Sequence, residues 1–156
     1  MTVCLHGWIM NSNLFNSLEE AAVQSLLTLN STSKKSLSAD RLWIMNYFAL
    51  FAKDFDFGFK NLYGDSLYNS ALFATRQQLI KNCIKFLLLK ELIERDITSI
   101  HLRYQITDRG KNLCRKFNSD FSLDYIRITK TIDEKISSLS DKELIYLIQN
   151  STINKE

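Results

Sequence analysis

Proline is absent from this chain, and glycine occurs only four times among its 156 residues. These two residues interrupt helices and strands and form most tight turns, so a chain that nearly lacks them favours long helices with few sharp turns. Hydrophobic residues make up 46% of the sequence, and a chain of this length buries roughly 68–70% of its unfolded surface. We therefore expect a mainly helical protein with a substantial core.

Serine and threonine mark the expected helix starts, because their side chains accept hydrogen bonds from backbone N–H groups that the first turn leaves free. Ser17 with Glu20 forms a capping-box pattern, and Ser140 with Glu143 forms another. Apolar spacing predicts helices over residues 14–29, 39–52 (capped by Ser38), 71–90, 107–117 (capped by Thr107) and 123–136, and a last helix after Ser140 that runs through Ile148.

The helix over residues 71–90 has the clearest division between an apolar and a polar side. Its expected buried stripe consists of Leu72, Leu79, Cys83, Phe86 and Leu87. Its expected outward side carries Arg76, Gln77, Lys81 and Lys85. In the helix over residues 39–52 the pattern likewise places Arg41 and Asn46 outward.

A short β-hairpin is expected between the helices over residues 71–90 and 107–117. Residues 92–95 read as its first strand and 96–99 as a turn, and the apolar alternation over 100–106 predicts a return strand that buries Leu102 or its neighbours. The aromatic residues between 54 and 67 predict a loop that packs on the core. Helix, helix, hairpin and capped helix in this order predict an α+β winged-helix domain over residues 37–118. An N-terminal arm and helix (1–36) would precede it, and a C-terminal helical arm (119–156) would follow.

Several short segments carry a family resemblance: residues 14–17, Asp40-Arg-Leu42, Asn46-Tyr-Phe48, residues 64–68, Thr75-Arg76, and residues 87–93. Over residues 14–137 the chain resembles the small middle component of bacterial ABC-three component systems, which include the Lamassu-type defence complexes. It departs from that family at Asn46, where an aspartate is typical, at Tyr68, where a histidine is typical, and in keeping only Arg76 of an arginine pair.

The resemblance implies a subunit without chemistry of its own. Such a subunit would sit beside an SMC-like ATPase and an effector, commonly a nuclease, in defence against phages or plasmids. On this interpretation the apolar residues of the C-terminal helices contact a partner chain, with Leu144, Leu147 and Ile148 as the candidate interface.

Positive charge is concentrated in the middle of the chain. Residues 76–116 hold ten basic and four acidic residues, a net charge of +6 in a chain whose total is +3. This asymmetry indicates an acidic partner, although a solvated face that maintains solubility is an equal alternative. The candidate contacts to nucleic acid or to an acidic protein are Arg76, Gln77, Lys81, Lys85, Arg95 and Arg103.

The sequence shows no pattern typical of catalysis. No histidine, cysteine or carboxylate pair stands at zinc-ligand spacing, and no glycine loop precedes the Lys-Ser or Lys-Thr that would hold phosphates. We expect no enzyme activity, cofactor or metal, and no membrane span. The odd and widely spaced Cys4, Cys83 and Cys114 favour the reducing cytoplasm, with Cys83 in the core.

A second interpretation is a free-standing winged-helix regulator of transcription. It would direct Gln77, Lys81 and Lys85 at the major groove and place Arg95 and Arg103 on phosphates. Acidic Glu91, Glu94 and Asp96 lie in the same hairpin, where a wing that contacts phosphates should be basic. The adaptor interpretation is therefore favoured over the regulator.

Overall fold

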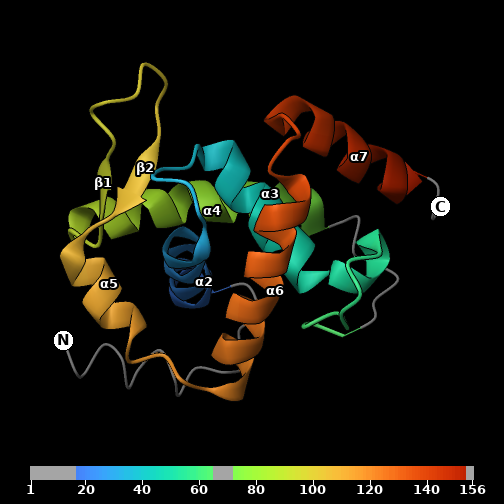
Figure 1. The fold of residues 1–156 in the computed structure, drawn as a ribbon, viewed down its shortest axis with the longest axis horizontal. Helices are drawn as coiled ribbons and strands as arrows, with labels where there is room; N and C mark the ends of the chain where they lie inside the picture. Colours follow the sequence, from blue (N-terminus) through green and yellow to red (C-terminus); the bar gives the residue numbers. More distant parts are fainter. Residues whose placement is uncertain (1–16, 65–71, 154–156) are drawn as a thin grey trace.

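The computed structural model describes residues 17–64 and 72–153, and Cys4 and the motif residues 14–16 and 66–68 lie outside it. The described chain is mainly helical with one two-stranded antiparallel sheet (Figure 1). Its elements are α2 (Leu18–Ser31), α3 (Ala39–Leu50), the 3-10 helix η1 (Ala52–Phe55), α4 (Leu72–Leu89), β1 (Ile93–Arg95), β2 (Tyr104–Ile106), α5 (Asp108–Cys114), α6 (Asp120–Ile136) and α7 (Asp141–Ile153). The predicted helices are confirmed, with small differences at their ends.

Helix α2 lies at the centre of the fold, where it contacts α3, α4, α5, α6 and β2 (Figure 1). The Ser17 hydroxyl caps it by accepting a hydrogen bond from the backbone N–H of Glu20 at 3.2 Å, as the sequence predicted. The buried residues of α2 are Ala21, Ala22, Gln24, Ser25, Leu26, Leu27, Thr28 and Leu29, which cover most of its circumference. A helix that is buried on nearly all sides lies inside the core, and α3, α4, α5 and α6 pack around α2.

The hairpin is shorter than the sequence predicted. Its strands pair Ile93 with Ile106 and Arg95 with Tyr104. Leu37, from the segment before α3, adds an isolated bridge to Tyr104, with backbone hydrogen bonds of 2.9 and 2.8 Å. Tyr104 is buried, but Leu102 is 53% exposed, so the prediction that a return strand beginning at residue 100 buries Leu102 or its neighbours holds for Tyr104 only.

Gly110 allows α5 to lie directly against the base of the hairpin. A Cβ atom at this position would collide with the backbone carbonyl oxygen of Leu92, and it would lie 2.7 Å from the Cγ1 atom of Ile106. The Thr107 hydroxyl caps α5 by accepting a hydrogen bond from the N–H of Gly110 at 3.1 Å. The glycine is therefore explained by the close approach of two backbone segments.

Arg41, on α3, forms hydrogen bonds with the segment that joins α6 to α7 and with the start of α7. Its Nε donates to the Asp141 carboxylate at 2.7 Å, and its Nη2 donates to the carbonyl oxygen of Leu139 at 2.6 Å. The Ser38 hydroxyl donates to the other oxygen of Asp141 at 2.8 Å. Arg41 and Asn46 are both buried, so the prediction that they face outward is wrong. These contacts hold α7 against the body of the protein.

The aromatic loop after α3 packs on the core, as predicted. The ring of Phe48 lies 4.7 Å from that of Phe55 and 5.2 Å from that of Phe57, both edge to face. This geometry is the preferred one for aromatic pairs. Asp56 adopts a left-handed backbone conformation that ends the 3-10 helix and turns the chain back.

One cluster of buried apolar residues extends from α2 to α7. This cluster includes residues from each of the three segments that the sequence predicted as separate parts. The domain boundaries 1–36, 37–118 and 119–156 remain a prediction. Within the described residues, no helix is both long enough and apolar enough to pass through a membrane.

Candidate interaction surfaces

Arg76 was predicted to contact nucleic acid or an acidic protein, but it is fully buried, so this prediction is wrong. Its Nη2 donates to Oε1 of Gln24 at 2.8 Å and to Oδ1 of Asn46 at 2.9 Å. Its guanidinium carbon lies 5.7 Å from the centre of the Tyr63 ring, in cation–π geometry. Asn46 in turn donates to the Tyr125 hydroxyl at 3.1 Å. These polar groups join α2, α3, α4 and α6 inside the core.

The helical spacing of α4 explains the position of Arg76. The fully buried residues Ile80, Cys83 and Leu87 follow Arg76 at intervals of four, seven and eleven positions, which is one face of a helix. Leu79 and Phe86, expected in the stripe, are only partly buried. The buried face therefore keeps Cys83 and Leu87 of the predicted stripe, but it includes Arg76 and Ile80 in place of Leu79 and Phe86. The helical periodicity was predicted correctly. The predicted face differs from the observed one because Arg76 was expected on the outward side.

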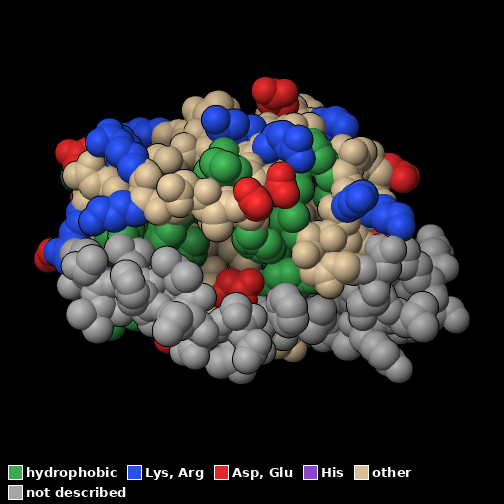
Figure 2. Space-filling model, turned by 90° about the horizontal axis from the view of Figure 1, so that it is seen from below, with side chains coloured by type: hydrophobic (Ala, Val, Ile, Leu, Met, Phe, Trp, Pro, Cys, Tyr) green, Lys and Arg blue, Asp and Glu red, His purple; other side chains and the backbone are tan. Residues whose placement is uncertain are grey.

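The other predicted contacts are exposed or partly exposed, but they lie on different elements. Lys81 and Lys85 are exposed one turn apart on α4, and Gln77 is partly exposed on the same helix. Arg95 is exposed on β1. Arg103 precedes β2 and is partly buried, because its Nη2 donates to the carbonyl oxygen of Ser36 at 2.7 Å. In the face seen in Figure 2, described basic side chains are interspersed with acidic and apolar ones.

A polar cleft of about 710 Å³ lies between the end of α2, the hairpin and α5. Its charged lining residues are Lys34, Lys35, Glu94, Asp108, Arg109 and Lys111. Four bases against two acids give the cleft a net positive lining. None of these residues was predicted as part of a site, because they come from three separate stretches of the chain.

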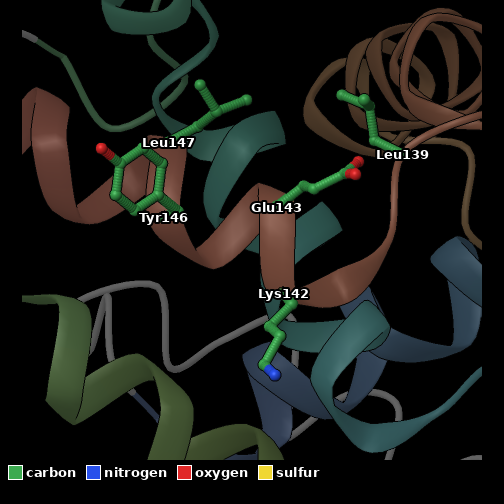
Figure 3. A pocket seen from close by; sticks show the side chains of 5 residues that line it. All are labelled: Leu139, Lys142, Glu143, Tyr146 and Leu147. Atoms are coloured by element: carbon green, nitrogen blue, oxygen red, sulfur yellow. The ribbon is translucent and has the colours of Figure 1, made fainter.

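Helix α7 contributes both to the core and to the surface. Leu144 and Ile148 are fully buried, so the prediction that they contact a partner is wrong. Leu147, the third predicted interface residue, is 48% exposed, and Tyr146 beside it is 65% exposed. Together with Leu139, Lys142 and Glu143 they line an open depression of about 510 Å³ (Figure 3). We call these five residues the α7 surface.

The tip of the hairpin, residues 96–103, carries the most exposed isoleucines of the described chain. Ile97 is 90% exposed and Ile100 is 95% exposed, and the tip extends away from the helices (Figure 1). The turn at residues 96–99 was predicted, but the exposure of the isoleucines was not, because the alternation of apolar residues over 100–106 is typical of a half-buried strand. The Asp96-Ile-Thr98 segment places Ile97 inside that turn, which is the signal that this side chain would be exposed.

The described cysteines have the properties of core residues. Burial raises the pKa of Cys83 to about 12 and that of Cys114 to about 12. Thiols with such pKa values are almost entirely protonated at neutral pH and are poor nucleophiles. Within residues 17–64 and 72–153, no group of three or more histidine, cysteine or acidic side chains could hold a metal ion.

The described surface thus carries two groups of exposed apolar side chains, one on α7 and one at the hairpin tip. The family model described as the ABC-three component (ABC-3C) system Middle Component 2 matches residues 14–155. The chain therefore belongs to this family of middle components, as the resemblance predicted. Neither the curated proteins nor the solved structures contain a significant match.

Proposed function

We propose that this protein is a non-catalytic adaptor in an anti-phage or anti-plasmid defence complex of the Lamassu type. It would bridge an SMC-like ATPase and an effector nuclease in the cytoplasm. Membership of the middle-component family supports a role among protein partners. The α7 surface is the structural observation that carries the proposal, since it leaves Tyr146 and Leu147 exposed on a helix that is otherwise fastened to the core.

The α7 surface has the composition of a protein-binding patch. A tyrosine and two leucines supply apolar area, and Lys142 and Glu143 stand beside them as a polar rim. Figure 3 shows Glu143 directed toward Leu139 and Lys142 pointing away from it. Because Leu144 and Ile148 anchor the opposite side of α7, the patch is held in place before a partner binds, which lowers the entropy cost of association.

The proposal also includes a winged-helix arrangement. The order of α3, α4, the hairpin and α5 supports it, as does the bridge from Leu37 to Tyr104, which adds a third extended segment beside the two strands. In such a domain the hairpin would form the wing.

The adaptor function is tested by co-expression with the neighbouring components, followed by purification through a tag on this chain. The wild-type protein should retain its partners, whereas Tyr146→Asp with Leu147→Asp should lose one of them, because an unpaired charge is costly in a buried interface. Leu123→Asp on α6 is the matched control, since Leu123 is 54% exposed and should tolerate the change. A wild-type protein that retains no component would overturn the adaptor function.

Direct contact with DNA is a second candidate, favoured by the exposed pair Lys81 and Lys85 on α4. Binding through such lysines should be weak, independent of sequence and strongly reduced by salt, because phosphate contacts release counterions. Lys81→Glu with Lys85→Glu should abolish it without unfolding the protein, which fluorescence anisotropy and a thermal melt would measure. Tight sequence-specific binding would instead support the free-standing regulator.

A further inference from the structure

Three large apolar side chains are exposed within six residues at the hairpin tip. Ile97 and Ile100 are almost fully exposed, and Leu102 is 53% exposed. Isolated exposed leucines are ordinary on protein surfaces, but several neighbouring apolar side chains on one projecting element usually mark a binding site. The tip therefore has the apolar area needed to insert into another molecule.

Hydrogen bonds of Asp96, which is 4% exposed, hold the start and the base of the tip. Its carboxylate accepts hydrogen bonds from the Ser36 hydroxyl at 2.6 Å and from the backbone N–H of Thr98 at 3.0 Å. Its own N–H donates to the carbonyl oxygen of Arg103 at 2.9 Å, which closes the tip across its base. Ile97 thus projects from a hydrogen-bonded turn, and Ile100 follows it within a tip whose two ends are joined, which lowers the conformational freedom to be lost on binding.

The charged groups around the tip are mainly positive. Arg95 is exposed, and Lys35 approaches the tip through a 3.0 Å hydrogen bond from its Nζ to the Thr98 hydroxyl. Arg103 is partly exposed at the other end of the tip, and the negative Asp96 is enclosed by its hydrogen bonds. Glu94, beside Arg95 on β1, is an exposed acid that offsets one of these three positive charges. A partner surface that is complementary to this arrangement has an apolar pocket surrounded by carboxylates.

We propose that the hairpin tip docks into an apolar, acid-rimmed pocket on another protein component of the same system. This inference rests on the adaptor function and adds a second contact, separate from the α7 surface. In Figure 1 the projecting hairpin and α7 lie at different places on the molecule, which is the arrangement that a bridge between two subunits requires. A protein is favoured over DNA because the side chains that extend furthest are aliphatic, and Glu91 and Glu94 are exposed on the same hairpin.

The test replaces both isoleucines by serine and measures affinity for each of the other purified components by biolayer interferometry. Ile97→Ser with Ile100→Ser should weaken binding to one component by about tenfold or more, since both side chains would be buried in the complex. Leu89→Ser is the matched control, because Leu89 is 83% exposed at the end of α4 and outside the hairpin, and it should leave binding within about twofold. Thermal melts should show all three proteins folded.

Two further measurements make the outcomes distinguishable. Arg95→Glu should slow association with the same component, and added salt should reduce the difference from wild type. The docking proposal is overturned if the serine variant binds every component as wild type does, while the loss of binding in the α7 variant would still support the adaptor function. It is also overturned if the serine variant loses only DNA affinity, or if the wild-type protein binds no component, in which case the adaptor function fails as well.

Discussion

Arg76 shows how one side chain can connect four helices. Its guanidinium group reaches Gln24 on α2 and Asn46 on α3, and Asn46 continues the connection to Tyr125 on α6. Buried polar groups of this kind are tolerated because their hydrogen bonds are satisfied, and they become costly when a partner is removed. The network therefore makes the relative position of the helices depend on a few specific residues.

We expect Arg76→Ala to lower the free energy of unfolding by about 1–3 kcal/mol, because it leaves the Gln24 and Asn46 oxygens without their charged donor. Lys81→Ala on the same helix is the control, since Lys81 is exposed and the change should stay within about 0.5 kcal/mol. Urea denaturation followed by circular dichroism measures both. Equal stability of the two variants would contradict the buried network.

Asp96 gives the fold a dependence on pH. Hydrogen bonds from Ser36 and Thr98 hold the pKa of Asp96 well below its usual value, which is about 3.9 in an unfolded chain. The ionised carboxylate therefore stabilises the folded state at neutral pH, and this contribution is lost as the pH falls below about 4 toward the lower folded-state pKa.

We expect Asp96→Asn to lower the melting temperature at pH 7, because the amide cannot accept all the hydrogen bonds that the carboxylate accepts. The difference from the wild type should shrink as the pH approaches 3, since below about pH 4 Asp96 takes up a proton in the unfolded wild-type chain, which lowers the free energy of the unfolded state relative to the folded one. Melting curves of both proteins between pH 7 and pH 3 provide the measurement. A difference that stays constant over this range would show that the charge of Asp96 does not stabilise the fold.

At the scale of the element, the helix starts were predictable because each cap is a local interaction. In Ser140 and Glu143 both hydrogen bonds of the capping box form, at 3.1 and 3.2 Å. The order of helices and hairpin was predictable for the same reason, since periodicity is read over a few neighbouring residues. The orientation of α4 was not, because Arg76 is buried by contacts with Gln24 and Asn46 that are distant in the sequence.

The hairpin illustrates a second limit of sequence analysis. Alternating apolar residues predicted a strand from residue 100, but the hydrogen bonds of Asp96 turn residues 97–102 outward before the pairing at Tyr104 begins. The prediction of the binding surfaces failed in a related way. Leu147 is exposed, as a partner contact requires, whereas Leu144 and Ile148 are buried against the core, to which the ion pair from Arg41 to Asp141 also attaches α7.

The contact between α5 and the hairpin base leads to a prediction for Gly110. Gly110→Ala should destabilise the protein by about 1–3 kcal/mol, because the added methyl group forces the Leu92 carbonyl and Ile106 apart. Differential scanning calorimetry should show this as a lower melting temperature, by roughly 2–4 °C for each kcal/mol. Lys111→Ala, at the exposed neighbouring position, should melt close to wild type. An unchanged melting temperature for Gly110→Ala would exclude the close approach.

At the scale of the whole molecule, α7 joins the stability of the fold to the binding of partners. One side of the helix belongs to the core cluster and the other side forms the α7 surface. Arg41 and Asp141 connect the start of α7 to α3, which is itself in contact with α4 and α6. A change on the inner side of α7 should therefore affect the entire fold, and a change on the outer side should affect only binding.

Leu144→Ala and Leu147→Ala test this division within a single helix. Leu144 is fully buried, so its truncation leaves a cavity and should cost about 2–5 kcal/mol, as expected also for Leu87→Ala in α4. Leu147 is about half exposed, so Leu147→Ala should leave the melting temperature nearly unchanged and weaken only the capture of a partner. A thermal melt measures the stability of each variant, and a pull-down with the other components measures its binding to partners. If Leu144→Ala melts like wild type, α7 is not part of the core, and its outer surface would lose the fixed position on which the adaptor function depends.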